Sequence, residues 1–214
     1  MSSTVHIIDD DRMARESLQW LIESAGLPVR VYASGLDFLH SVEPSTCGCV
    51  LLDVRMPDIN GMELYARLKR MGILLPVLIV TGHADVAMAV RAMKAGAYDF
   101  IEKPYNDALM LERVQSAISA DQQQRHAQQR VMAIKARAAL LTPREQEVLQ
   151  HVLRSTQNKI IAAKLGISIK TVELHRANLM TKMQARTSTE LVRLALLAGL
   201  DKATSEVAGP GPTP

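Results

Sequence analysis

The sequence predicts an α/β fold with a doubly wound, five-stranded parallel sheet, followed by a small all-α domain of four helices. The first observation is that five short apolar runs alternate with five segments of helical spacing over residues 1–120. The second is that several of these runs end at a carboxylate, a hydroxyl or a lysine. The third is the charge: residues 1–120 carry 11 Lys and Arg against 15 Asp and Glu, whereas residues 142–200 carry 9 against 4. This asymmetry indicates two domains, the second with a polyanionic partner.

Five short runs of aliphatic and β-branched residues, bounded by turn residues, are typical of buried parallel strands. The clearest of them is Val50-Leu51-Leu52, which ends abruptly at Asp53. Right-handed crossovers through helices would join such strands into one sheet. The expected strands are residues 4–8, 29–32, 49–53, 76–81 and 98–102.

Between these runs, apolar residues recur three or four positions apart, which is the spacing of one helix face. Met13, Leu18 and Ile22 show this pattern, and Gly26 then ends the helix. Glycines or prolines follow most of the other segments in the same way. The expected helices of the first domain are residues 12–25, 36–42, 61–71, 86–95 and 107–119.

Polar residues mark the carboxyl ends of four of the expected strands. Asp9 and Asp10 follow the first strand, and Asp53 ends the third. Thr81 ends the fourth strand, and Lys103 follows the fifth. These ends meet at one rim if the four strands lie side by side. For Asp53 alone, a carboxylate that caps the next turn is the structural alternative.

The chemistry of this set favours phosphoryl transfer to a carboxylate. Three carboxylates repel one another unless a cation lies among them, and hard oxygen ligands with room for water suit Mg²⁺. The metal would leave one carboxylate oxygen free as a nucleophile for a phosphoryl group. Thr81 and Lys103 would then bind the oxygens of that group.

With Arg55-Met56-Pro57, Thr81-Gly82-His83 and Lys103-Pro104, the set resembles the receiver domain of two-component response regulators over about residues 1–120, and the FixJ subfamily in particular. The resemblance implies a flavodoxin-like fold with a cis peptide bond before Pro104. It also implies that Asp53 is the phosphoacceptor. The Mg²⁺ ligands that it implies are Asp10, Asp53 and the carbonyl of Arg55, with Asp9 acting through water. The switch residues that it implies are Thr81, Phe100 and Lys103.

Residues 121–141 predict a helical linker. They are rich in Gln, Ala and Arg and contain neither Gly nor Pro. An apolar stripe runs along this segment and is suited either to pairing two chains or to packing on the second domain, although service as a simple linker is the favoured interpretation. The stripe consists of Val131, Ile134, Ala138 and Leu141.

Residues 142–200 predict four helices, of which the middle two form a helix-turn-helix. Thr142, Pro143 and Glu145 have the order of an N-cap, a first helical proline and a capping box. Helices over residues 158–165 and 169–183 are joined by Leu165-Gly166-Ile167-Ser168. A fourth helix begins at Thr187 or Ser188 and ends before Gly199. We expect Val172, Leu179 and Met183 of the third helix to face the core.

The third helix is the expected recognition helix, because Lys170, Glu173, Leu174 and Ala177 share its other face. The alternative is a solvated face on a small bundle. Leu141-Thr142-Pro143-Arg144-Glu145 and Thr171-Val172-Glu173 are among the motifs that resemble the LuxR-type DNA-binding domain. The sequence departs from that family near Ser155-Thr156, where a glycine is usual. The expected DNA contacts are Lys159, Lys170, Thr171, Glu173, Leu174, His175, Arg176, Ala177, Asn178 and Lys182.

Together the two resemblances imply a DNA-binding transcriptional regulator, not an enzyme, that a partner histidine kinase activates at Asp53. The implied partners are double-stranded promoter DNA, RNA polymerase and a second copy of the chain, which would pair through residues 86–102. The main alternative is a regulator that works without phosphorylation and uses its first domain for docking. A phosphatase of the haloacid dehalogenase type would need a second Asp where Arg55 stands, and a basic helix-turn-helix disfavours an RNA-binding antiterminator.

Composition narrows the cellular setting. No apolar stretch approaches the roughly 18 residues of a membrane-spanning helix, and the N-terminus lacks a basic region followed by an apolar signal core. Cys47 and Cys49 are too closely spaced for a zinc site. These features predict a cytoplasmic protein, and residues 201–214, rich in Gly, Pro, Ser and Thr, predict a disordered tail.

Overall fold

The computed structural model describes residues 3–82 and 86–201. The chain divides into two compact units, the first ending at Arg125 and the second beginning at His126. Each unit is described by itself. The expected disordered tail lies, except for Asp201, outside the described residues.

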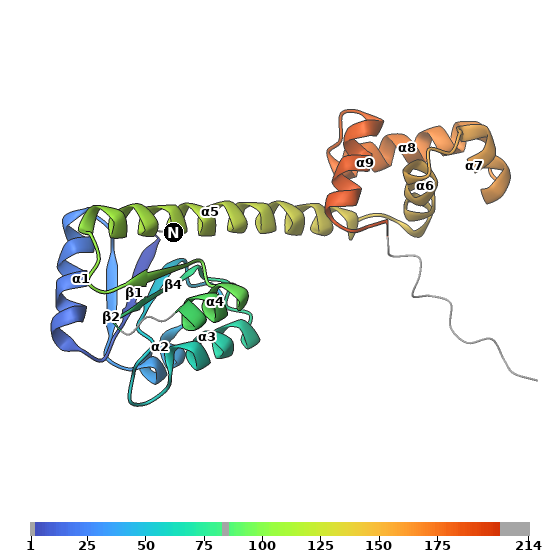
Figure 1. Cartoon of the computed structure of the whole chain (residues 1–214). Helices are drawn as coiled ribbons and strands as arrows, with labels where there is room; N and C mark the ends of the chain where they lie inside the picture. The colour runs from blue at the N-terminus through green and yellow to red at the C-terminus, as the bar shows by residue number, and fades with distance from the viewer. Residues whose placement is uncertain (1–2, 83–85, 202–214) are drawn as a thin grey trace, which may run out of the picture. The chain divides into compact units, whose positions relative to one another are not determined.

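The N-terminal unit contains the predicted five-stranded parallel sheet (Figure 1). Its strand order is β2-β1-β3-β4-β5, so the four strands that carry polar ends are neighbours, as expected. Ile8 pairs with Leu52 in register, which brings the carboxyl ends of β1 and β3 to the same rim. The strands are β1 (Thr4–Ile8), β2 (Val29–Tyr32), β3 (Gly48–Leu52), β4 (Val77–Thr81) and β5 (Asp99–Glu102).

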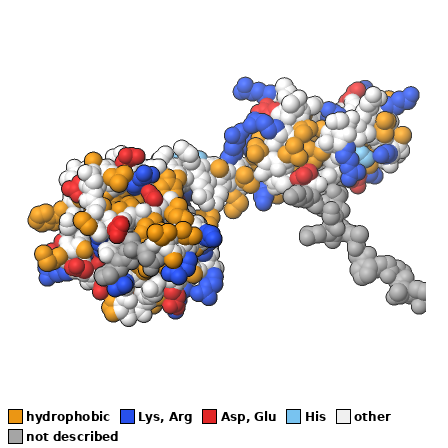
Figure 2. All heavy atoms as spheres, viewed as in Figure 1, with side chains coloured by type: hydrophobic (Ala, Val, Ile, Leu, Met, Phe, Trp, Pro, Cys, Tyr) orange, Lys and Arg blue, Asp and Glu red, His pale blue; other side chains and the backbone are white. Residues whose placement is uncertain are grey.

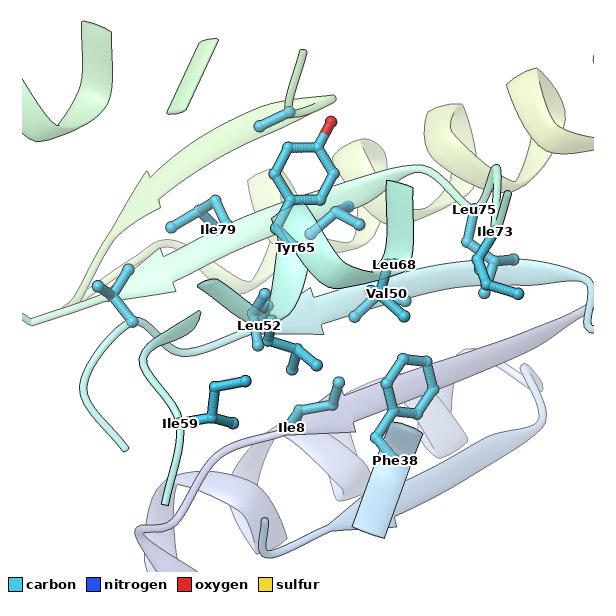
Figure 3. Close-up of a cluster of buried hydrophobic side chains, with 14 of the residues drawn as sticks. Ile8, Phe38, Val50, Leu52, Ile59, Tyr65, Leu68, Ile73, Leu75 and Ile79 are labelled. Atoms are coloured by element: carbon cyan, nitrogen blue, oxygen red, sulfur yellow. The ribbon is translucent and has the colours of Figure 1, made fainter. Parts of the chain in front are cut away.

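Helices cover both faces of this sheet, which confirms the doubly wound fold (Figure 1). On one face, α1 and α5 pack against Val5, Ile7 and Leu51. On the other face, α2, α3 and α4 pack against Ile8 and Leu52, as Figure 3 shows around Phe38 and Leu68. The helices are α1 (Arg12–Ser24), α2 (Gly35–Ser41), α3 (Gly61–Arg70), α4 (Val86–Lys94) and α5 (Asp107–Ala138).

Helix α5 is longer than the sequence predicts, because it continues without a break through the expected linker to Ala138. Its Ile134 and Ala138, together with Leu141, are buried in the core of the C-terminal unit. These three residues of the apolar stripe therefore pack in the second domain, which was the alternative to the favoured interpretation of a simple linker.

The C-terminal unit contains the four predicted helices: α6 (Pro143–Leu153), α7 (Asn158–Leu165), α8 (Ile169–Met183) and α9 (Ser188–Leu197). Thr142 and Glu145 form the capping box expected at the start of α6. Val172, Leu179 and Met183 are fully buried, as predicted for the core face of α8. At the departure from the LuxR-type pattern, Ser155 adopts a φ of 53°, a conformation that glycine reaches without steric cost.

Candidate functional site

Asp53 is the centre of a buried cluster at the carboxyl rim of the sheet. It directly follows β3, and its backbone N–H donates to the carbonyl of Ile8 on β1. The ammonium of Lys103 lies 3.2 Å from Asp53 Oδ1 and 2.6 Å from Asp9 Oδ2. The backbone N–H of Arg55 donates to Asp53 Oδ2 at 2.6 Å. The structure therefore brings Asp9, Asp53 and Lys103 together from three strand ends.

The cluster holds more negative charge than one lysine balances. Burial raises the pKa of the Asp53 carboxyl above its ordinary value; the charge of Lys103 opposes that rise, and the charge of Asp9 adds to it. Burial alone would lower the pKa of the Lys103 ammonium, but its contacts with Asp9 and Asp53 outweigh burial and raise it. Two buried carboxylates beside one ammonium form a site that a further cation would neutralise.

The expected metal ligands only partly converge. Asp9 and Asp53 are buried side by side, whereas the side chain of Asp10 is exposed. Within residues 3–82 and 86–201, no three His, Cys, Asp or Glu side chains form a group that could hold a metal. The donor set still suits Mg²⁺, which needs one or two carboxylates and otherwise retains water.

The expected switch residues lie on neighbouring strands. Thr81 is buried at the end of β4, and its carbonyl accepts a hydrogen bond from the backbone N–H of Lys103. Phe100 on β5 is half-buried against the core of the α3 and α4 face. The Lys103–Pro104 peptide bond is cis, as the resemblance implies. His83, the third residue of the Thr81 motif, lies outside the described residues.

Two residues of this site were not identified from the sequence. Arg15 on α1 donates to the carbonyl of Asp9 at 2.6 Å and thereby holds the loop that carries the acidic pair. Gly61 begins α3, and a Cβ at this position would lie 2.2 Å from the carbonyl oxygen of Asp53. The Asn60-Gly61 dipeptide is typical of a turn. The sequence does not show that Gly61 lies close to Asp53, because that contact depends on tertiary packing.

In the C-terminal unit, α8 presents the exposed face that the sequence predicts. Leu174 is 60% exposed although it is a large apolar residue, and the nearby Lys170, Glu173 and Ala177 are exposed too. Lys159 on α7 is also exposed. Thr171 and His175 are half-buried and Asn178 is exposed. Lys and Arg side chains group on the surface of this unit (Figure 2).

Two of the expected DNA contacts have partners inside the unit. Arg176 donates to Asn158 Oδ1 at 3.1 Å and to Ser188 Oγ at 3.0 Å, so it connects α8 with the starts of α7 and α9. Lys182 pairs with Glu145 at 2.7 Å. Both side chains contact neighbouring helices of the unit, and their expected contacts with DNA remain predictions.

Comparison with known families agrees with this arrangement. Residues 5–115 match the response regulator receiver domain, and residues 139–195 match the bacterial regulatory proteins of the luxR family. The chain belongs to the FixJ family of response regulators. It is 46% identical to the transcriptional regulatory protein FixJ of Azorhizobium caulinodans over 199 residues, which cover 93% of this chain and 94% of that protein.

Other FixJ-like proteins are similar over nearly the whole chain. The response regulator TodT of Pseudomonas putida is 42% identical over 90% of this chain and 85% of its own length. The solved structure of the response regulator StyR has a TM-score of 0.83 at 37% identity and covers 92% of this chain and 99% of that one. The solved structure of full-length FixJ from B. japonicum has a TM-score of 0.57 at 42% identity, and the match covers 94% of this chain and 99% of that one.

Membership of the FixJ family gives the chain its general function. It is a two-component transcriptional regulator with a receiver domain and a LuxR-type DNA-binding domain, and the receiver implies a histidine kinase as partner. Among the described residues, no helix is both long and apolar enough to cross a membrane.

Proposed function

We propose that Asp53 accepts a phosphoryl group from a partner histidine kinase. The observation that carries this proposal is the Asp53 carboxylate at the rim of the sheet, with the Lys103 ammonium 3.2 Å from its Oδ1. An Asp53 oxygen attacks phosphorus, the bond to the phosphohistidine nitrogen breaks, and an acyl phosphate forms. Lys103 then pairs with a phosphoryl oxygen, and this contact replaces part of its contact with the carboxylates.

Asp10, Asp53 and the Arg55 carbonyl would hold Mg²⁺ directly, and Asp9 would hold it through water. The excess of buried carboxylate over ammonium supports this role. When bound, the metal neutralises charge on the phosphoryl oxygens during transfer.

Phosphorylation would act on the second domain through the α4–β5 surface. The Thr81 hydroxyl moves toward the phosphoryl group and Phe100 rotates into the space behind it. Helix α4 exposes Val86, Val90 and Met93, with Val86 82% exposed, so this surface is apolar enough to pair with a second copy. Pairing would place two α8 helices on two half-sites of promoter DNA in the cytoplasm, where the dimer would recruit RNA polymerase.

The proposed DNA-facing surface combines the exposed face of α8 with residues that flank it. Lys159 and Lys170 would contact phosphates, whereas Glu173, Leu174 and Ala177 would face base edges. Thr171, His175 and Asn178 would complete the contacts to the DNA backbone or support the helix.

The proposal is tested by treating the full chain with acetyl phosphate and Mg²⁺ and separating the products on a Phos-tag gel. The parent and Asp58→Asn should give a shifted band, whereas Asp53→Asn should give none. Asp58 is a suitable control because its carboxylate lies in the same loop but accepts from Ser34 and Leu36. A shifted band in Asp53→Asn would place the acceptor elsewhere, and none in the parent would favour a regulator that works without phosphorylation.

A further inference from the structure

The shortest ion pair in the described part of the DNA-binding domain connects the last turn of α8 with the first turn of α6. Lys182 Nζ lies 2.7 Å from Glu145 Oε2 and 3.2 Å from the carbonyl oxygen of Leu140. The Glu145 side chain is buried, with 3% of its surface exposed, and the Lys182 side chain is 34% exposed. The pair therefore joins two helices through residues that are 37 positions apart in sequence.

The position of the Glu145 side chain is fixed by its hydrogen bonds in the capping box of α6. Its Oε2 accepts from the backbone N–H of Thr142 at 2.8 Å, and its own N–H donates to Thr142 Oγ1 at 3.3 Å. Burial alone would raise the pKa of this carboxyl, but the hydrogen bonds from Lys182 and Thr142 hold it below its ordinary value. The carboxylate thus stays charged in a buried place, and removal of its cation would leave that charge uncompensated.

We propose that Lys182 is a positioning residue, which fixes the recognition helix α8 on α6 through Glu145 and does not contact DNA phosphates. The inference rests on the proposed role of α8 in recognition. A lysine contributes to phosphate binding when its ammonium is free to displace counterions. The Lys182 ammonium already has two acceptors. If it left them for a phosphate, the buried Glu145 carboxylate would have no cation beside it.

Lys159 differs from Lys182 in that its side chain has no partner inside the described part of the domain. It is exposed, and within the part of the chain that the structure describes it makes no hydrogen bond or ion pair. Its ammonium is available to phosphates. The two lysines should therefore differ in how their loss changes the salt dependence of DNA binding.

The experiment uses the full chain with Lys182→Met, Glu145→Gln, the two combined, and Lys159→Met as the matched control. Gln at position 145 keeps the capping box, so the double variant removes both charges without removing the cap. The probe is a duplex selected by the parent protein from a randomised pool, with a scrambled duplex as competitor. Affinity is measured at several salt concentrations, and thermal unfolding is recorded for each variant.

If Lys182 positions α8, Lys182→Met should lose several-fold in selectivity for the chosen duplex and unfold at a lower temperature, while its salt slope stays that of the parent. The double variant should recover most of the selectivity. Lys159→Met should keep its selectivity and stability, and the magnitude of its salt slope should fall by about one.

A salt slope lowered by about one in both Lys182→Met and the double variant would overturn the proposal, and so would normal selectivity in Lys182→Met. If Lys182→Met does not fold, the double variant decides the question by its slope alone. Glu173→Ala, measured beside them, reports separately whether α8 recognises bases, so failure of the proposed function would be visible there.

Discussion

A Cβ atom on Gly61 would lie 2.2 Å from the carbonyl oxygen of Asp53, so the two residues approach this closely only because position 61 has no side chain. The same Cβ would lie 2.9 Å from the Cα of Val54, whose carbonyl accepts from the Gly61 N–H. The first turn of α3 therefore rests directly on the backbone of the proposed phosphoacceptor.

Gly61→Ala should slow phosphorylation of the receiver. The added methyl group must push α3 and the Asp53 backbone apart, which moves the carboxylate from Lys103 and costs about 1–3 kcal/mol of stability. The rate of acetyl phosphate labelling, followed on Phos-tag gels, should fall about tenfold or more. Gly72→Ala is the control, because it strains a φ of +72° but has no heavy atom within 4 Å of the added Cβ. Equal rates in the two variants would show that the contact does not shape the site.

The sequence predicted those parts of the site that local pattern controls. Asp9, Asp53 and Lys103 could be assigned because each follows an apolar run, and parallel strands bring their carboxyl ends to one rim. The buried face of α8 could be assigned because helical spacing places its core residues on one side.

The remaining features depend on contacts between distant segments, which no local pattern encodes. Gly61 appeared only as a helix start, and its approach to Asp53 follows from the packing of α3. Lys182 was predicted to contact DNA from its charge alone, and its pairing with the buried Glu145 is not visible in the sequence. Residues 121–141 were predicted to be helical, but their continuity with the helix over residues 107–119 was not, because composition favours helix without showing where one helix ends.

A receiver fragment that ends at residue 126 should be more stable than one that ends at residue 120. Asp121 is buried and accepts from the backbone N–H of Gly48 at 2.9 Å, and Arg125 pairs with Asp121 and donates to the Thr46 carbonyl. Loss of these charge-assisted hydrogen bonds should cost about 1.5–3 kcal/mol. Urea unfolding, followed by the fluorescence of Trp20 on α1, measures the difference.

The matched variant is Asp121→Ala in the longer fragment, which should lower its stability toward that of the shorter one. Equal stability of all three fragments would mean that residues 121–125 add nothing to the receiver.

Acid should weaken the receiver through His6. This buried histidine packs against the rings of Tyr32 and Phe38, which also contact each other, and its Nδ1 lies 3.3 Å from the Tyr32 hydroxyl. Burial, with a smaller effect of the Arg30 charge, lowers its pKa from 6.5 to about 4. Below pH 6.5 His6 binds a proton in the unfolded chain but not in the folded chain. The free energy of unfolding therefore falls as the pH drops from about 6.5 to about 4. This pKa shift corresponds to a loss of about 3 kcal/mol in the free energy of unfolding across that pH range.

Urea unfolding at pH 7.5 and pH 5, again followed by Trp20, measures this dependence. His6→Gln should flatten it, whereas replacement of the exposed His126 by Gln should leave it as in the parent. An unchanged pH dependence in His6→Gln would assign the acid sensitivity to other groups.

Replacement of Glu173 should change which DNA sequences the protein prefers. Glu173 is exposed on α8 and, within the described residues, makes neither a hydrogen bond nor an ion pair, so no partner inside the domain explains it. Its charge is repelled by phosphates, and it gains from DNA only by accepting a hydrogen bond. In the major groove the amino group of cytosine is the donor that a carboxylate accepts from, a contact that contributes about 1–3 kcal/mol of discrimination.

Glu173→Ala should therefore bind non-cognate DNA as well as the parent or better, while its selectivity at one base pair per half-site relaxes. Lys159→Met should behave in the opposite way, because the loss of a phosphate contact weakens binding to all sequences alike. Competition binding against a randomised half-site, at two salt concentrations, distinguishes the two patterns. If Glu173→Ala retained the full sequence preference of the parent, α8 would have to recognise DNA through Leu174, Ala177 and the shape of the groove, since the carboxylate would then contribute only repulsion.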